Sequence, residues 1–337
     1  KIWYPKHLSL EQCSSEITAR YKARLLQGDS LTDLTGGFGI DCSFLATGFK
    51  SATYVERQEE LCEIAAHNFP VLNLNHINIK NEDGVTYLQA MSPVDCLFLD
   101  PARRNEHGGK TVAISDCEPN VAELEELLLQ KANRVMIKLS PMLDLSLALK
   151  ELKQTQEVHI LSVNNECKEL LILLGQTSPA EISIHCVNLF TKGTQKEQHF
   201  VFTREQEQCS ECTYTDSLET YLYEPNASLL KAGAFRSIAA AYPVRKLHPN
   251  SHLYTSDTFI ENFPGRIFRI VNQCSFNKKE VKENLADLKK ANVTVRNFPA
   301  TVAELRKRIH LAEGGDTYLF ASTLNNGQKV LIRCEKV

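Results

Sequence analysis

Three acidic residues stand at the ends of short apolar runs, where parallel strands present side chains to a ligand. Asp33 ends the first run, Glu56 ends Ala52–Glu56, and Asp100 follows Val94–Leu99. A carboxylate at such a place can accept hydrogen bonds from hydroxyl and amino groups. Because a carboxylate that ends a hydrophobic strand is costly to bury without a task, Asp100 in particular indicates a binding or catalytic role.

A glycine-rich turn, Thr35–Gly39, separates the first run from an expected helix that begins at Asp41. Glycines let a ligand approach the backbone closely, and the start of a helix offers unpaired N–H groups. A dinucleotide-binding turn has the pattern Gly-x-Gly-x-x-Gly. Here Gly37-Phe38-Gly39 is followed by Cys42 where the third glycine belongs. The turn therefore indicates a nucleotide-like ligand other than a dinucleotide.

The spacing Asp-x-x-x-Gly-x-Gly that starts at Asp33 resembles motif I of the class I methyltransferases, which bind S-adenosyl-L-methionine (SAM). The resemblance implies that Asp33 accepts from the amino group of SAM, directly or through water, and that Glu56 accepts from the ribose hydroxyls. It also implies that Asp83 receives the adenine amino group, with Glu82 as the competing choice, and that Asp100 lies beside the transferable methyl group. The expected cofactor-binding residues are Asp33, Thr35, Gly36, Gly37, Gly39, Glu56, Asp83 and Asp100.

Four charged residues form a second candidate constellation. Lys138 ends the fifth apolar run and Glu166 follows the sixth, so both should meet Asp100 at one edge of a parallel sheet. Lys22, in the helix before the first strand, is placed to reach the same centre. The order Lys–Asp–Lys–Glu is similar to the tetrad of the ribose 2′-O-methyltransferases of RNA. That resemblance implies a lysine of lowered pKa that steers or removes a hydroxyl proton. The alternative is a structural ion pair between Lys138 and Glu166.

The segment Asp100-Pro-Ala-Arg103 resembles the Asp-Pro-Pro-[Tyr/Phe/Arg] motif of methyltransferases that act on nucleic-acid bases. Amino-methylating members stack an aromatic residue on the base, but this chain has Arg103 and Arg104 there. The difference argues against amino methylation, and two arginines suit phosphate contacts. Pyrimidine C5 methylation needs a nucleophilic cysteine, and neither Cys117 nor Cys167 lies at the matching place.

Strand-like and helix-like segments alternate before residue 165. Repeated βα units predict an α/β fold with a parallel sheet covered by helices on both faces. The expected strands are 31–35, 52–56, 76–79, 94–99, 134–139 and 158–163, and the expected helices are 11–27, 58–68, 83–90, 121–131 and 145–153. The runs 182–190 and 199–203 could add antiparallel edge strands.

The polar segment around residues 206–225 indicates a linker. Beyond it, helical periodicity over 227–241, 278–291 and 302–310 alternates with strand-like runs, and Asn326-Gly327 is a strong hairpin signal. This pattern predicts a second, α+β domain. We therefore expect a helical lead-in over 1–28, a catalytic domain over 29–205, a linker over 206–225 and a second domain over 226–337.

Charge is unevenly distributed along the 337 residues. The chain carries −3 overall, whereas residues 245–337 hold 16 Lys and Arg against 9 Asp and Glu, a local charge of +7. This asymmetry indicates a polyanionic partner. No apolar run reaches the length of a membrane span and no signal peptide is present, so we expect a cytoplasmic protein without a membrane partner. Cys209-Ser-Glu-Cys212 lacks a second pair at a zinc-like spacing, so no metal is expected.

Taken whole, the chain resembles a group of methyltransferase-like proteins with a THUMP-like C-terminal domain. The segments that carry this resemblance are SSEITARYKA (14–23), DLTGGFGID (33–41), YVE (54–56), DPARR (100–104), IKLSPMLD (137–144), NNECKELL (164–171), FPGRIFRI (263–270), NFPATVAELRKR (297–308) and EGGDTYLFAS (313–322). The resemblance implies a Rossmann-like class I methyltransferase sheet followed by a THUMP-like domain that binds structured RNA. The expected RNA-binding residues are Arg103, Arg104, Lys278, Lys279, Arg306, Lys307 and Arg308.

Two functions of different classes follow. The first is a SAM-dependent methyltransferase that modifies structured RNA, tRNA or rRNA, at a base or a ribose 2′-O. The alternative is an RNA-binding or assembly protein that keeps a SAM pocket but lacks turnover. The intact series of acids, Asp100 above all, argues against an inactive pocket. A small-molecule methyltransferase is a third possibility, against which the basic second domain argues.

Overall fold

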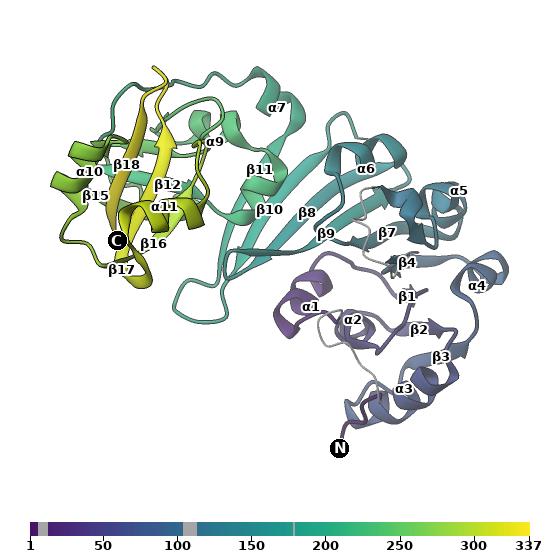
Figure 1. The fold of residues 1–337 in the computed structure, drawn as a ribbon. Coiled ribbons are helices and arrows are strands. Elements are labelled where there is room, and N and C mark those ends of the chain that lie inside the picture. The colour runs from purple at the N-terminus through teal and green to yellow at the C-terminus, as the bar shows by residue number, and fades with distance from the viewer. Residues whose placement is uncertain (6–12, 104–112, 178) are drawn as a thin grey trace. The chain divides into compact units, whose positions relative to one another are not determined.

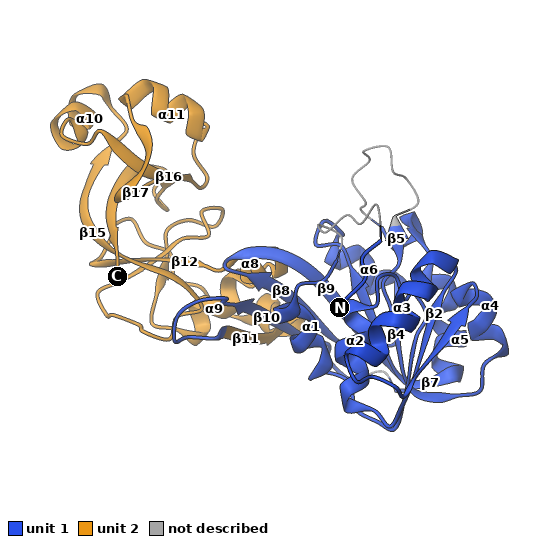
Figure 2. Cartoon of the chain, turned by 90° about the horizontal axis from the view of Figure 1, so that it is seen from below, with its two compact units in different colours: residues 1–197 blue, residues 198–337 orange. Residues whose placement is uncertain are grey.

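The computed structural model describes residues 1–5, 13–103, 113–177 and 179–337. The chain forms two compact units, Lys1–Glu197 and Gln198–Val337 (Figures 1 and 2). Each unit has its own sheet and its own hydrophobic core. We therefore describe each unit by itself.

The first unit is built on a mixed sheet with the strand order β10-β8-β9-β7-β4-β1-β2-β3 (Figure 1). Its strands are β1 (Ser30–Asp33), β2 (Ser51–Glu56), β3 (Ile77–Asn81), β4 (Val94–Leu99), β7 (Ala132–Leu139), β8 (Thr155–Val163), β9 (Glu166–Gly175) and β10 (Ser183–Leu189). The five strands from β7 to β3 in this order pair in parallel. The predicted α/β class is confirmed, and β5 (Ala102–Arg103) and β6 (Cys117–Glu118) pair separately.

The predicted set of strands lacks β9, which follows β8 after a sharp reversal of the chain. Asn164 and Asn165 have φ of +49° and +67°, which makes a two-residue connection of the kind that joins hairpin strands. β9 consequently runs antiparallel to both β8 and β7, between which it lies. The expected direction of the 182–190 strand is also wrong, because β10 pairs with β8 in parallel.

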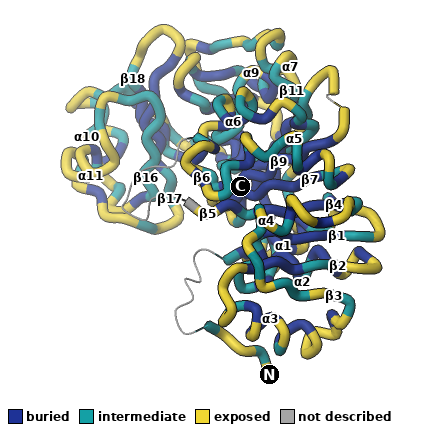
Figure 3. Tube along the Cα trace, turned by 90° about the vertical axis from the view of Figure 1, so that its right-hand side faces the viewer, coloured by how far each residue is buried: buried dark blue, intermediate teal, exposed yellow. Residues whose placement is uncertain are grey.

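Helices cover the sheet and position the N-terminal residues. They are α1 (Glu16–Ala23), α2 (Ile40–Leu45), α3 (Glu59–Val71), α4 (Gly84–Ala90), α5 (Val121–Lys131) and α6 (Leu145–Glu151), with 3₁₀ turns at Ala46–Gly48 and Ile114–Asp116. Ser15 caps α1 by accepting the N–H of Thr18. The described helix is therefore shorter than the predicted 11–27, of which residues 11 and 12 lie outside the described residues. Tyr21 of α1 joins the core against Leu161 and Leu189 of the sheet, and Figure 3 shows how much of the sheet is buried.

The second unit holds a sheet with the order β13-β14-β12-β15-β18-β17-β16. Its elements are α7 (Arg204–Cys209), β12 (Tyr221–Pro225), α8 (Ala227–Ala232), α9 (Phe235–Ala241), β13 (Arg245–Lys246), β14 (Tyr254–Ser256), β15 (Gly265–Ser275), α10 (Lys278–Leu285), β16 (Lys290–Val295), α11 (Val302–Ile309), β17 (Ala312–Thr323) and β18 (Lys329–Lys336), and β11 (Glu197–Thr203) begins at the boundary between the units. No helix among the described residues of either unit combines the length and the apolar character needed to cross a membrane.

Two details of the second unit follow from single residues. Gly233, with φ of +76°, ends α8 in a left-handed cap, so the predicted helix 227–241 is two helices. The predicted hairpin at Asn326-Gly327 is confirmed, since β17 and β18 are antiparallel and Gly327 has φ of +85°. In the segment expected to be a linker, Glu207 of α7 accepts the N–H groups of three residues at the start of α9.

Candidate active site

The glycines of the turn Thr35–Gly39, between β1 and α2, are required by both conformation and packing. The φ angles of Gly37 and Gly39 are +53° and +82°, in the left-handed region that favours glycine. A Cβ atom on Gly36 would lie 2.3 Å from the ring of Tyr54, so no side chain fits there. The sequence therefore folds locally into a tight turn that exposes backbone groups at the carboxyl end of β1.

Glu56, the last residue of β2, reaches across to this turn. Its carboxylate accepts the N–H of Gly37 at 2.9 Å and that of Gln58 at 2.8 Å. Only 8% of the residue is exposed. Because an ionised carboxylate has about four lone-pair sites, these two bonds leave capacity for a ligand.

Asp83 lies on the surface as the N-cap of α4. Its Oδ1 accepts the N–H groups of Val85 and Thr86, each at 3.0 Å. The neighbouring Glu82 donates its N–H to the carbonyl of Glu56 at 3.1 Å. The structure therefore brings the loop that carries Asp83 beside the end of β2, and gives Asp83 a structural task there.

Asp33 is buried, with 1% of the residue exposed. Its Oδ1 accepts the N–H of Thr35 at 2.9 Å. Burial raises the pKa of Asp33 to about 8, against the hydrogen bond from Thr35, and the nearby charges of Asp41 and Asp100 raise it further. A carboxyl group in this position favours a cationic neighbour, which would stabilise its ionised form.

Five charged side chains and one serine hydroxyl gather beside the turn in a group that we call the charged cluster. Its members are Ser14, Lys22, Asp41, Asp100, Lys138 and Glu169. Lys138 Nζ lies 2.6 Å from Asp100 Oδ2 and 3.2 Å from Asp41 Oδ2. Lys22 Nζ lies 2.5 Å from Glu169 Oε2 and 3.0 Å from Asp41 Oδ1. Asp41 is thus shared between two ammonium groups, and each ammonium group contacts two carboxylates.

The hydroxyl of Ser14 joins the two halves of the charged cluster. It accepts from Lys22 Nζ at 2.8 Å and from Lys138 Nζ at 3.1 Å. Its own hydrogen reaches Asp41 Oδ2 at 2.8 Å or Glu169 Oε1 at 3.2 Å. The residue before the N-cap of α1 is therefore part of the site.

The members of the charged cluster differ in how far solvent, and therefore a substrate, can reach their side chains. The side chain of Asp100 is 36% exposed, whereas that of Lys22 is fully buried and those of Lys138, Asp41 and Glu169 are at most 10% exposed. The N–H of Asp100 donates to Thr35 Oγ1 at 2.6 Å, which ties it to the glycine turn. Asp100 is consequently the member that a substrate can reach, and the others support it.

The charge states within the cluster follow from its pairing. Burial acts to lower the pKa of Lys138, but the carboxylates of Asp100, Asp41 and Glu169 outweigh it and raise that pKa. For Asp41 burial acts to raise the pKa, but the ammonium groups of Lys22 and Lys138 outweigh it and lower that pKa. The lysine of lowered pKa that the tetrad implies is therefore absent at Lys138, which stays protonated.

Glu166 lies outside the charged cluster, contrary to the expectation. It is exposed at the start of β9 and pairs with Lys168 at 2.6 Å. Because the chain reverses at the preceding Asn-Asn pair, the acid that reaches Lys22 is Glu169, farther along β9. Asp41, in the first turn of α2, was likewise outside the expected set. The signal for it is its place directly after the glycine turn.

The expected RNA-binding residues are unevenly placed. Arg104 lies outside the described residues, and of Arg103 the structure describes the backbone, at the end of β5. Lys278, Lys279, Lys307 and Arg308 are exposed on α10 and α11. Arg306 is 18% exposed and lies 3.8 Å from Glu313.

An aromatic and cationic hollow accompanies these helices. The guanidinium of Arg308 lies 4.1 Å from the ring centre of Phe276, which packs edge-on against Phe298. Phe276 and Arg308 line a hollow of about 220 Å³ together with Pro299, Ala300, Glu304 and Leu305. Rings and guanidinium planes are the groups on which unstacked bases stack.

The geometry predicts that the two acids of β9, Glu166 and Glu169, contribute unequally to the free energy of unfolding. Glu169→Gln should lower the free energy of unfolding by about 3 kcal/mol, because it leaves the buried Lys22 with one carboxylate fewer. Glu166→Gln should change it by less than about 0.5 kcal/mol, as at other exposed positions. Urea unfolding followed by circular dichroism measures both. Equal losses for the two variants would contradict the assignment of Glu169 to the cluster.

Family models match the C-terminal part of the chain. Residues 221–264 match a ferredoxin-like domain, and residues 265–336 match a THUMP domain-like family. Both ranges lie within the second unit. None of the curated proteins compared with the chain matches it.

Solved structures cover the first unit as well. A candidate methyltransferase from Porphyromonas gingivalis W83 is 37% identical, with a TM-score of 0.91 over 100% of this chain and 84% of that one. An rRNA methylase from Streptococcus thermophilus is 14% identical over 47% of this chain and 93% of that one, with a TM-score of 0.34. Because the first likeness spans the whole chain, the protein belongs to the family of the P. gingivalis protein, with a class I methyltransferase fold and a C-terminal THUMP-like domain.

Proposed function

We propose that the protein is a SAM-dependent methyltransferase that modifies structured RNA, tRNA or rRNA. The observation that carries the proposal is the setting of Asp100, the exposed end of the charged cluster, bonded through its N–H to the glycine turn. Such a carboxylate lies at the carboxyl edge of the sheet, where ligands bind in α/β folds. The methyltransferase fold of the family supports this assignment.

The residues around the turn fit SAM. Asp33 is a buried acid whose pKa of about 8 falls when a cation binds beside it, and the amino group of SAM is such a cation. Glu56 has acceptor capacity for two ribose hydroxyls, and the loop of Asp83 borders the same strand end. When bound, SAM supplies an electrophilic methyl group on a sulfonium.

The charged cluster determines the role of Asp100 in this proposal. Lys138 remains an ammonium group and therefore does not act as a general base. It holds the Asp100 carboxylate in one orientation through a contact of 2.6 Å. Asp100 then accepts a hydrogen bond from an amine or hydroxyl of the acceptor and orients the lone pair of that nitrogen or oxygen towards the methyl group. The same carboxylate would take the proton that the acceptor loses, and S-adenosyl-L-homocysteine would be the leaving group. The acceptor is a base or a ribose 2′-hydroxyl.

The second unit supplies the surface for RNA in this proposal. Lys278, Lys279 and Lys307 are exposed cations on α10 and α11, and phosphate contacts of this kind position an RNA without reading its sequence. The hollow beside Phe276 and Arg308 offers stacking surfaces for an unpaired base. The match to the THUMP domain-like family supports the same partner.

SAM binding should strengthen as the pH rises towards 8. The bound state needs an ionised Asp33, so below the pKa of about 8 binding must expel a proton. The Kd of SAM should fall by up to about tenfold for each pH unit between 6 and 8 and then level off. Isothermal titration calorimetry in buffers of different ionisation enthalpy measures both the Kd and the proton released.

The control for this pH dependence is Asp33→Asn. The variant should bind SAM more weakly and with the same Kd across the range, because it lacks the titrating group. A wild-type Kd that does not change between pH 6 and 8 would rule out Asp33 as the partner of the amino group.

Methyl transfer should depend on Asp100. With tritiated SAM and bulk RNA from a strain that lacks this protein, Asp100→Asn should lower the initial rate of labelling about 100-fold. Asp29→Asn removes an exposed carboxylate at the amino end of β1 and should keep the wild-type rate. Nucleoside analysis of the product distinguishes a base from a ribose. SAM binding without labelling of any RNA would instead favour a binding protein that lacks turnover.

RNA affinity should fall with salt through the second unit. For the double variant Lys279→Ala/Lys307→Ala, the slope of log Kd against log salt should decrease by about 0.7 to 0.9 for each lost phosphate contact. Lys50→Ala, which removes an exposed lysine of the first unit, serves as the control. Filter binding at several salt concentrations gives the slopes. Identical slopes for wild type and double variant would place the RNA elsewhere.

A further inference from the structure

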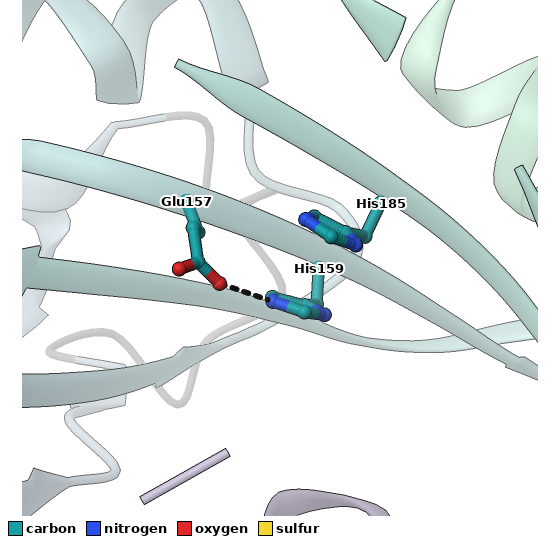
Figure 4. A group of neighbouring side chains, drawn as sticks. All are labelled: Glu157, His159 and His185. Atoms are coloured by element: carbon teal, nitrogen blue, oxygen red, sulfur yellow. Dashed lines mark hydrogen bonds and ion pairs between the residues drawn. The ribbon is translucent and has the colours of Figure 1, made fainter. Parts of the chain in front are cut away.

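Two histidines and a glutamate meet on one face of the sheet of the first unit, outside the charged cluster. Glu157 and His159 stand two positions apart on β8, so their side chains point to the same face. His185 on β10 is the register partner of His159 in the parallel pair. One ligand atom from each of the three side chains lies within 4.8 Å of the other two (Figure 4).

The outer atoms of two of these side chains are already held. Tyr21 Oη lies 2.8 Å from His159 Nδ1, and the guanidinium of Arg134 lies 2.9 Å from Glu157 Oε1. These contacts leave His159 Nε2 and Glu157 Oε2 facing each other at 3.2 Å. Metal-binding histidines and carboxylates have such support in their outer shell, which fixes the ring and the tautomer.

The separation of the two inner atoms suits a metal ion. Ligands about 2.0 to 2.1 Å from a tetrahedral zinc ion lie about 3.3 Å apart, close to the observed 3.2 Å. Two imidazoles and one carboxylate form a ligand set typical of zinc and similar ions.

We propose that Glu157 Oε2, His159 Nε2 and a ring nitrogen of His185 bind a divalent first-row transition-metal ion of the zinc type, with water in the fourth position. Binding requires His159 to carry its proton on Nδ1 and donate it to Tyr21 Oη. It also requires the ring of His185 to turn, because the two imidazoles are stacked with centres 4.2 Å apart and planes 12° apart. One ring nitrogen of His185 lies within 4.8 Å of the other two ligand atoms before the ring turns.

The ion would act as a structural link in the first unit. It would join β10 to β8, and through Tyr21 it would fix α1, the helix that also carries Lys22 of the charged cluster. Cysteine spacing could not reveal such a site, since its ligands are brought together by strand register and not by a sequence motif.

The test uses the full chain, Zn²⁺ and the variant His185→Phe. Phenylalanine keeps the ring stacked on His159 but removes the ligand nitrogen. Calorimetric titration with Zn²⁺ should give a Kd at least tenfold higher for the variant than for the wild type, since even the loss of an outer-shell partner costs about tenfold. Zn²⁺ should likewise raise the Tm of the wild type more than that of the variant.

Two further measurements separate this site from thiols and from other histidines. Co²⁺ bound by the wild type should show ligand-field bands without thiolate-to-cobalt charge transfer, because the ligands are nitrogen and oxygen. His67→Phe, which alters a histidine stacked on Trp3, should keep the wild-type Kd. The proposal is overturned if His185→Phe binds Zn²⁺ as tightly as the wild type, or if the cobalt spectrum is that of a thiolate site.

Discussion

The site depends on how the buried ammonium group of Lys138 is compensated. Taking an ion out of water costs several kcal/mol, and one partner rarely offsets that cost. Here the contacts are shared, since Lys138 faces both Asp100 and Asp41 while Lys22 faces both Asp41 and Glu169. The members come from α1, from Ser14 before the N-cap of α1, from α2, β7 and β9, and from the residue that follows β4. The charged cluster can form only when these elements are all in place, so the geometry at Asp100 is coupled to the fold of the first unit.

Much of this fold follows from local patterns, and the departures have local causes. Repeated βα units predict the parallel strands, and strand ends predict Asp33, Glu56 and Asp100 at one edge. The apolar run of β9 does not indicate the direction of the strand, because such a run reads the same either way. Its direction is decided by Asn164 and Asn165 in left-handed conformations. Once the chain reverses there, Glu169 and not Glu166 points at Lys22.

The charge state of a side chain is harder to predict from the sequence than its position in the fold. Spacing can bring a lysine to a strand end, but the direction of its pKa depends on how many carboxylates surround it after folding. At Lys138 three carboxylates outweigh burial. The structure places Lys22, Asp100 and Lys138 of the tetrad together, whereas the raised pKa of Lys138 argues against a proton-accepting role for that lysine. The solvent exposure of the Asp100 side chain is likewise a property of the folded structure that no sequence motif predicts.

The contacts of helix α1 connect the N-terminal segment to the charged cluster. Tyr21 and Lys22 are consecutive, yet the first contacts His159 on β8 and the second contacts Glu169 on β9 and Asp41 on α2. Ser14, just before the helix, bonds to both lysines of the cluster. Without α1, Asp41 and Glu169 would lose the ammonium group of Lys22, which contacts both of them. Carboxylates that lack such a partner repel each other. A lead-in that the sequence analysis separates from the catalytic domain is therefore a structural part of the charged cluster. An ion that fixed α1 through Tyr21 would act on the same helix that neutralises the cluster.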